Sequence, residues 1–154
     1  MRDCVTAYVG LGANLGDAVA AVEAALVSLD TLPGTRVVAR SGLYRSAPQG
    51  ASGPDFINAV AALSTRLTAP DLLGALLALE TTAGRQRPYV HAPRTLDLDL
   101  LRYGDARIDS PELTLPHPRM QARAFVLVPL AQIAPSLVTP ASLAAVAGQR
   151  MQKL

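Results

Sequence analysis

The segment Arg94-Thr95-Leu96-Asp97-Leu98-Asp99-Leu100-Leu101 alternates leucine with aspartate, which is the pattern of a β-strand with one buried face. Successive side chains of a strand point to opposite faces, so the leucines share one face while Asp97 and Asp99 share the other. Their Cβ atoms are then about 7 Å apart. We therefore predict a strand over residues 96–103 that presents two carboxylates on a single face.

The rest of the chain contains strand and helix patterns in a regular order. These patterns predict strands over 5–11, 37–44 and 56–65, and helices over 18–29, 70–83, 121–133 and 142–149. The order β-α-β-β-α-β, followed by helices, matches a ferredoxin-like α+β fold, an antiparallel sheet with helices on one face. A chain of 154 residues has a common single-domain size, so we expect one domain over residues 1–154.

A glycine-rich turn, Gly10-Leu-Gly-Ala-Asn-Leu-Gly16, follows the first predicted strand. It is similar to the fingerprint of dinucleotide-binding folds, but its third glycine comes one residue late and no Gly-Lys-Ser/Thr sequence follows. A Rossmann or P-loop nucleotide site is therefore excluded. If ATP binds this chain, arginine and aspartate side chains must hold its phosphates.

The composition is that of an ordinary globular protein, with 50% hydrophobic residues, 17% charged residues and a net charge of +2. Cys4 is the single cysteine, so no intrachain disulfide can form, and a reducing compartment, the cytoplasm, is expected. The N-terminal sequence lacks the apolar block of a signal peptide. The most apolar stretch, 18–29, is too short to cross a bilayer, so no membrane partner is expected.

The paired aspartates form the first candidate site. Aspartate is disfavoured in strands, and two like charges on one face repel each other unless a cation lies between them. Hard oxygen ligands at this spacing suit Mg²⁺, including a pair of ions that bridges a polyphosphate. The alternative is a solvated strand face with buried leucines behind it.

Arginine side chains form the second candidate site. Half of the 14 basic residues lie in one stretch of the chain, at Arg85, Arg87, Arg94, Arg102, Arg107, Arg119 and Arg123. One guanidinium group can bind two phosphate oxygens at once. The arginines of segment 84–94 therefore predict a loop that closes over a nucleotide. His117 and Arg123 are further candidate phosphate contacts. The alternatives are a solvated basic loop and a structural histidine between prolines.

The two phenylalanines of the chain form the third candidate site. Phe56 and Asn58 share a strand face, so a flat heterocycle could stack on the ring while the carboxamide reads its polar edge. Phe125 could close the other side of that heterocycle. The alternative is a core phenylalanine beside an edge-strand asparagine.

Several motifs in matching order and spacing make the chain similar to the 6-hydroxymethyl-7,8-dihydropterin pyrophosphokinase family of folate synthesis. They are Tyr8-Val-Gly-Leu-Gly-Ala-Asn-Leu-Gly16, Tyr44-Arg-Ser-Ala-Pro48, Pro54-Asp-Phe-Ile-Asn-Ala59, Pro93-Arg-Thr-Leu-Asp-Leu-Asp99, Leu115-Pro-His117 and Pro129-Leu-Ala-Gln-Ile-Ala-Pro135. The resemblance implies a ferredoxin-like fold and the transfer of pyrophosphate from Mg-ATP to the hydroxymethyl-pterin, with release of AMP.

The resemblance also implies roles for individual residues. Two Mg²⁺ ions would sit on Asp97 and Asp99, and catalysis would fall to Arg85, Arg94, Asp97 and Asp99. The pterin would stack between Phe56 and Phe125 and be read by Asn58, in a pocket lined by Ser46, Pro48 and Gly50. The groups that would hold ATP are Glu80, Arg85, Arg87, Arg94, His117 and Arg123.

The chain departs from the family pattern at a few positions around the nucleotide. His91 stands where a tryptophan can occur, Val90 where a basic residue is usual, and Pro118 where an aromatic residue can follow the histidine. The 84–94 loop is also one residue short. These departures bear on loop geometry and nucleotide affinity and leave the reaction unchanged.

Two alternative functions remain open. An RNA-binding module would need exposed aromatic side chains on the sheet, and two Phe, four Tyr and no Trp supply few of them, so no nucleic acid partner is expected. A metal-dependent phosphohydrolase would use the same aspartates and release phosphate from ATP without a pterin. With small-molecule substrates alone, we expect a monomer.

Overall fold

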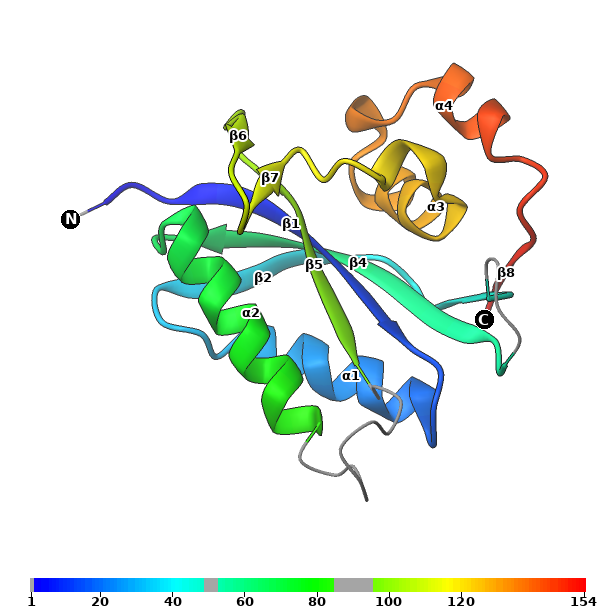
Figure 1. The fold of residues 1–154 in the computed structure, drawn as a ribbon, viewed down its shortest axis with the longest axis horizontal. Coiled ribbons are helices and arrows are strands. Elements are labelled where there is room, and N and C mark those ends of the chain that lie inside the picture. The colour runs from blue at the N-terminus through cyan, green and yellow to red at the C-terminus, as the bar shows by residue number, and fades with distance from the viewer. Residues whose placement is uncertain (1, 49–52, 85–95) are drawn as a thin grey trace.

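The computed structural model describes residues 2–48, 53–84 and 96–154, which form the expected α+β arrangement (Figure 1). The elements are β1 (Val5–Ala13), α1 (Ala18–Leu29), β2 (Thr35–Arg40), β3 (Tyr44–Ser46), β4 (Phe56–Thr65), α2 (Ala69–Gly84), β5 (Asp97–Tyr103), β6 (Ile108–Asp109), β7 (Thr114–Leu115), α3 (Ala124–Ile133), α4 (Pro140–Ala145) and β8 (Met151–Lys153). Short 3-10 turns cover Met120–Ala122 and Pro135–Leu137.

The main sheet is antiparallel and has the strand order β5-β1-β4-β3-β8, with β2 also paired to β4. Because β2 and β3 lie one after the other along β4, they act as one interrupted strand. The order β5, β1, β4 and β2/β3 is that of a ferredoxin-like sheet. This confirms the predicted fold class.

Helices α1 and α2 and strands β4 and β5 follow the sequence prediction closely. The helix predicted over 18–29 is α1, and the Asp17 side chain caps it by accepting a hydrogen bond from the Ala20 amide at 3.0 Å. Thr68 performs the same function for α2, where its Oγ1 accepts from the Asp71 amide at 3.1 Å. Strand β4 has the predicted bounds, and β5 begins one residue after the predicted start.

The prediction of one continuous strand over 37–44 was wrong, because this segment is divided into β2 and β3. At the break, the Ser41 amide donates to the Val60 carbonyl at 2.9 Å, and the Val60 amide donates to Ser41 Oγ at 3.0 Å. The Ser41 hydroxyl thus takes the place of one backbone acceptor in the hydrogen-bond ladder along β4. The next amide, that of Gly42, donates to Gln132 Oε1 on α3 at 3.0 Å instead of to a strand.

The C-terminal part differs most from the prediction. The helix predicted from 121 begins as α3 only at Ala124, because Arg123 is extended (φ −124°, ψ 109°) and separates α3 from the preceding 3-10 turn. The helix predicted over 142–149 is α4, which ends at Ala145, and the chain then forms β8 beside β3. The short pair of β6 and β7 was also not predicted.

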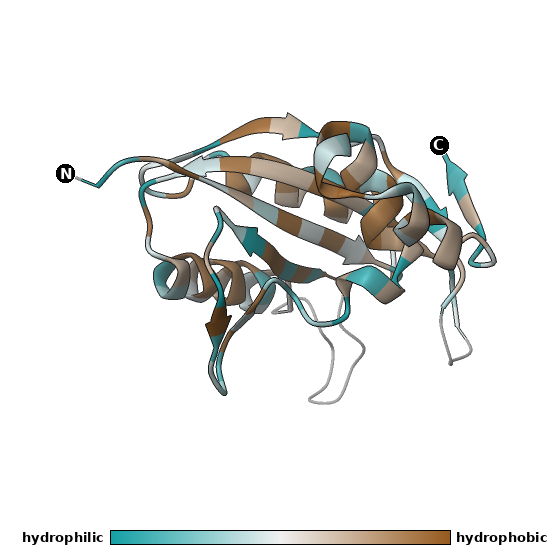
Figure 2. Ribbon diagram, turned by 90° about the horizontal axis from the view of Figure 1, so that it is seen from above, coloured by the Kyte–Doolittle hydropathy of each residue, from teal (hydrophilic) through white to brown (hydrophobic). Residues whose placement is uncertain are grey.

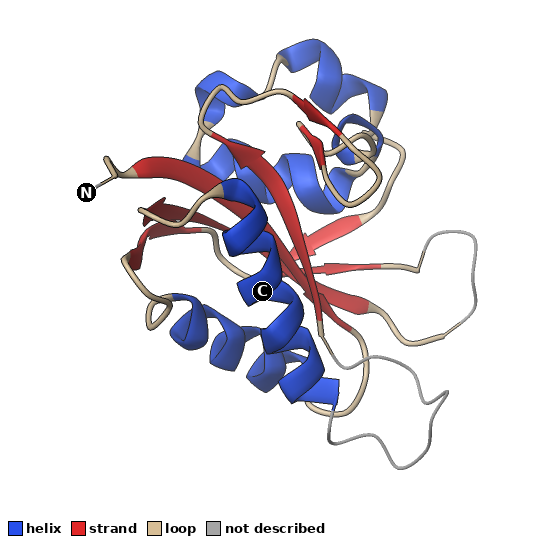
Figure 3. Cartoon of the chain, turned by 60° about the vertical axis from the view of Figure 1, so that its left-hand side comes forward, coloured by secondary structure: helices blue, strands red, loops and turns tan. Residues whose placement is uncertain are grey.

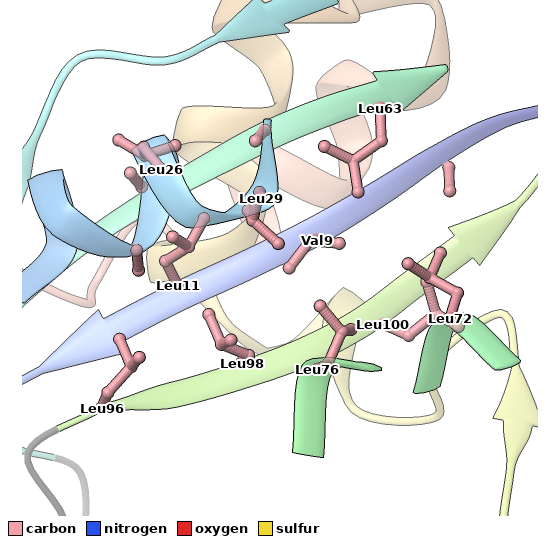
Figure 4. Packing of buried hydrophobic residues seen from close by; sticks show 14 of the residues in the cluster. Val9, Leu11, Leu26, Leu29, Leu63, Leu72, Leu76, Leu96, Leu98 and Leu100 are labelled. Atoms are coloured by element: carbon pink, nitrogen blue, oxygen red, sulfur yellow. The ribbon is translucent and has the colours of Figure 1, made fainter. Parts of the chain in front are cut away.

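Helices cover both faces of the sheet, so the prediction of helices on one face only was wrong (Figures 1 and 3). On one face, β1 and β5 pack with α1 and α2 through buried side chains that include Val9, Leu11, Leu29, Leu76 and Leu98 (Figure 4). On the other face, Val60 and Leu101 pack with α3 through Leu127 and Leu130. Figure 2 shows the hydrophobic residues along the strands. Strands that are hydrophobic on both faces need to be covered on both faces.

Candidate active site

The floor of the site is the part of the second sheet face that α3 leaves uncovered. Asp97 on β5 lies opposite Gly12 on β1, and Gly12 lies opposite Asn58 on β4. Asp99 is likewise opposite Gly10. Directly paired residues point to the same face of a sheet. The carboxylates of Asp97 and Asp99 therefore stand on one side of the two glycines, and the carboxamide of Asn58 stands on the other side of Gly12.

These glycines create the depth of the site. A Cβ atom at Gly12 would lie 3.4 Å from Asn58 Oδ1 and 3.9 Å from Phe56 Cδ1. A Cβ atom at Gly10 would contact the side chain of Leu101 at 3.6 Å. Any larger residue would therefore fill the hollow between β5 and β4.

A cavity of about 810 Å³ lies on this floor. It brings together eight of the residues predicted from the sequence, which are Ser46, Phe56, Asn58, Asp97, Asp99, His117, Arg123 and Phe125. The volume is sufficient for an organic ligand of drug-like size. The aspartates and the aromatic rings thus open into one space.

The carboxylate end of the cavity is partly open to water. The Asp99 side chain is 43% exposed, and its Oδ2 lies 3.8 Å from Nη1 of Arg123. Mg²⁺ is commonly bound through one or two carboxylates together with substrate phosphates and water. Asp97 and Asp99 offer two carboxylates of this kind to the cavity. Among residues 2–48, 53–84 and 96–154 there is no group of three or more His, Cys, Asp or Glu side chains around a common point.

His117 borders the same end of the cavity. Its amide donates to the Leu101 carbonyl at 2.9 Å, and its Nδ1 accepts from the Arg119 amide at 3.2 Å. Burial lowers the pKa of His117 below its usual 6.5; the nearby Asp99 raises it, while Arg123 and Arg119 lower it. The ring is therefore neutral at pH 7 with its proton on Nε2, which makes it a hydrogen-bond donor toward an anion.

The other end of the cavity is aromatic and polar. Asn58 is 3% exposed, and its Nδ2 donates to Oγ of Ser46 at 2.7 Å. Phe56 and Phe125 line the cavity from β4 and α3. The guanidinium carbon of Arg123 lies 5.3 Å from the centre of the Phe125 ring, within the range of a cation–π contact. Arg123 thus contacts both ends of the site.

Other predicted site residues lie away from this cavity or outside the described part of the chain. Pro48 lines a smaller neighbouring cavity of about 130 Å³, which shares Ser46 and Phe125 with the main one. Glu80 does not line the main cavity, and its Oε2 accepts from the Leu98 amide at 2.7 Å. The residues that lie outside the described part are Gly50, Arg85, Arg87, Arg94, Val90 and His91.

The sequence analysis missed several residues that line the cavity. Gly10, Leu11 and Gly12 come from the glycine-rich segment that fails as a nucleotide fingerprint, but they lie in strand β1 and form the floor. Their role follows from strand register, which a single sequence does not reveal. The others are Ala47, Pro118, Arg119, Ala122 and Val126. Arg119 was named in the arginine-rich stretch but was given no individual contact, although it follows the Pro-His-Pro motif directly.

None of the helices in the described ranges has the length and apolar character that a membrane-spanning helix needs.

Comparison with known proteins gives one consistent family. A model of the family described as 7,8-dihydro-6-hydroxymethylpterin-pyrophosphokinase (HPPK) matches residues 8–135. A 2-amino-4-hydroxy-6-hydroxymethyldihydropteridine pyrophosphokinase of Pseudomonas aeruginosa is 52% identical over 134 residues, which cover 86% of this chain and 83% of that protein. The Synechocystis sp. protein of the same name is 46% identical over 141 residues, covering 92% and 72%.

Solved structures support the fold. Wild-type HPPK-DHPS of Plasmodium falciparum superposes with a TM-score of 0.65 at 14% identity, covering 87% of this chain and 38% of that chain. A triple mutant of the same protein with STZ-DHP gives a TM-score of 0.72 at 14% identity, covering 88% and 40%. This chain thus spans well under half the length of those solved chains. On the strength of the family model and the 52% identical relative, the chain belongs to the 7,8-dihydro-6-hydroxymethylpterin-pyrophosphokinase family.

Proposed function

We propose that this chain transfers the pyrophosphoryl group of ATP to the hydroxymethyl group of 6-hydroxymethyl-7,8-dihydropterin, giving AMP and the pterin diphosphate, in folate biosynthesis. Family membership supports the reaction. The observation that carries the assignment of residues is a single cavity lined at one end by Asp97 and Asp99 and at the other by Phe56, Asn58 and Phe125.

The aromatic end fits the pterin. A bicyclic ring between Phe56 and Phe125 would gain stacking and burial of apolar surface. Asn58 would read the polar edge of the ring, because a carboxamide both donates and accepts hydrogen bonds. Its bond to Ser46 holds the carboxamide in one orientation before the substrate arrives, which reduces the entropy lost on binding.

The carboxylate end fits the phosphates of Mg-ATP. Asp97 and Asp99 would hold the Mg²⁺ ions, and we expect two of them. Bound Mg²⁺ would neutralise charge on the transferred group and make the acceptor hydroxyl more acidic. Arg123 and the neutral His117 would donate hydrogen bonds to phosphate oxygens. Arg85, Arg87 and Arg94, with Glu80 nearby, remain expected ATP contacts.

The reaction would be a direct in-line displacement. The hydroxymethyl oxygen forms a bond to the β-phosphorus of ATP, the bond from that phosphorus to the α,β-bridging oxygen breaks, and the electron pair leaves with AMP. The hydroxyl proton goes to solvent. Such a transfer requires mainly alignment and neutralisation of charge, so a covalent enzyme intermediate is not needed.

The direct test is incubation of the protein with ATP, Mg²⁺ and the reduced hydroxymethyl-pterin, followed by chromatography. AMP and the pterin diphosphate should form in equal amounts, and neither should form when the pterin or Mg²⁺ is omitted. Release of ADP and phosphate without the pterin would instead identify a phosphohydrolase and overturn the proposal.

We further propose that residues 1–154 act as one monomeric domain in the cytoplasm. Cys4 is an exposed free thiol, as a reducing compartment permits. An RNA-binding role is disfavoured because α3 packs over Val60 and Leu101 on the sheet face that RNA would need. Light scattering at the protein concentrations used in the assay checks the monomeric state.

A further inference from the structure

Gln149 makes two hydrogen bonds to the segment that begins α3, although it lies far along the chain between α4 and β8. Its Nε2 donates to the Ala122 carbonyl at 2.8 Å, and its Oε1 accepts from the Ala124 amide at 2.9 Å. These two peptide groups flank a single residue, Arg123. The carboxamide therefore clamps the backbone on both sides of the arginine.

The clamp acts where the chain is least regular. Arg123 is extended between a 3-10 turn and α3, and its own side chain makes no capping hydrogen bond at the start of α3. Ala124 is fully buried, so its amide at the start of α3 needs a partner, and Gln149 is that partner. Without the carboxamide, the peptide groups on both sides of Arg123 would lose these two hydrogen bonds, and the bond of the Arg123 amide to the Met120 carbonyl and those of the Arg123 carbonyl within α3 would remain.

The segment that follows Gln149 pairs with a strand that lines the cavity. Two residues later the chain enters β8, which pairs with β3 so that Met151 lies opposite Ser46. The Gln149 amide also donates to the Val146 carbonyl at 2.9 Å. The segment after α4 thus ties the start of α3 to the strand that carries Ser46.

The orientation of Arg123 matters because of what its side chain contacts. Nη1 lies 3.8 Å from Oδ2 of Asp99, and the guanidinium lies over the Phe125 ring at 5.3 Å. Arg123 and both of these partners line the main cavity.

We propose that Gln149 is a positioning residue for the transfer reaction, which holds the backbone on both sides of Arg123 and so directs the guanidinium toward Asp99 and the phosphates. This inference rests on the proposed function for its kinetic consequence. Its structural content, the dependence of Arg123 on Gln149, does not.

A double-mutant cycle of Gln149→Ala and Arg123→Ala tests the proposal. With Arg123 present, Gln149→Ala should lower kcat/KM about tenfold; in the Arg123→Ala background the same change should cost less than about twofold. Gln152→Ala is the matched control, because it removes an exposed glutamine from β8 of the same segment, and it should leave kcat/KM unchanged. An equal loss in both backgrounds, or no loss with Arg123 present, would overturn the positioning role.

A second variant and a second measurement keep the test decisive. Gln149→Glu retains an acceptor for the Ala124 amide but places a carboxylate oxygen against the Ala122 carbonyl, so it should also lower kcat/KM, and this loss should again require Arg123. If Gln149→Ala does not fold, Gln149→Glu takes its place in the cycle. A loss of kcat/KM in Gln149→Glu that persists in the Arg123→Ala background rejects the inference. The Arg123 Nε–H signal in ¹⁵N NMR should shift or broaden in Gln149→Ala and stay unchanged in Gln152→Ala. If the wild type forms no pterin diphosphate, the proposed function fails, and an unchanged Nε–H signal would then reject the positioning role separately.

Discussion

Replacing Gly12 with alanine tests the cavity floor with a single methyl group. The new Cβ would lie 3.4 Å from Asn58 Oδ1 and 3.9 Å from Phe56 Cδ1, so the folded chain accommodates it without a clash. A ligand atom, however, approaches a methyl carbon no closer than about 3.5 Å. The methyl group therefore lifts a bound ring from the floor and covers the oxygen of Asn58.

The expected magnitude follows from the contact that is lost. A hydrogen bond between the pterin and the buried Asn58 carboxamide would be weakened or broken, and leaving such a group unpaired costs about 1–3 kcal/mol. Since each 1.4 kcal/mol is tenfold in affinity, the dissociation constant and KM for the pterin should rise by about 5-fold to 150-fold. The KM for ATP should change much less, because the atoms found within 4 Å of the added Cβ belong to Asn58 and Phe56 and not to the aspartates.

The assay is chromatographic measurement of initial rates with either substrate varied, with pterin binding by calorimetry and unfolding in urea. Gly74→Ala is the control, since a Cβ at Gly74 on α2 meets nothing within 4 Å. It should leave both KM values unchanged and stabilise the chain by about 0.5–1 kcal/mol. A Gly12→Ala variant with normal stability and a normal KM for the pterin would refute the placement of the ring over this floor.

Three further predictions concern the metal, a titrating group and the core. Asp97→Asn and Asp99→Asn should each lower kcat/KM about a hundredfold or more, with the deficit largest at limiting Mg²⁺; near-normal turnover there would contradict the metal assignment. Because the pKa of His117 is lowered by burial, the unfolded chain binds that proton more readily, so stability should fall as pH drops through and below 6.5, and urea unfolding of His117→Gln should lose part of this pH dependence. Leu76→Ala, at a fully buried position, should lower the free energy of unfolding by about 2–5 kcal/mol, whereas Leu77→Ala, at a side chain 52% exposed, should change it by less than about 0.5 kcal/mol in the same urea titration.

Local signals predicted the elements that carry their own start and stop residues. Helix α1 has the predicted bounds because Asp17 caps it and Pro33-Gly34 follows it. Strand β5 was predicted from alternation alone, and that alternation correctly placed Asp97 and Asp99 on one face. A period of two residues is a property of the strand itself, so it needs no tertiary information.

Features that depend on a distant partner were not predictable. The break at Ser41 requires Val60, nineteen positions away, to exchange backbone and side-chain hydrogen bonds with it. Strand β8 has three residues, too few to show alternation, and exists because β3 has a free edge. The floor glycines required the register of β1 with both β4 and β5, which no local pattern contains.

The two faces of β5 explain why stability and activity should respond to different substitutions. Leu98 and Leu100 face α1 and α2, which seal that side of the sheet with a fully buried cluster. On the opposite face, Leu101 lies under α3 while Asp97 and Asp99 lie beyond its reach, next to the glycines of β1. A change at Leu76 therefore removes packing without altering the cavity, and a change at Gly12 alters the cavity without removing packing. If either substitution changed stability and pterin affinity together, the cavity floor and the core would have to be mechanically coupled through β5, and the separation of the two faces would be wrong.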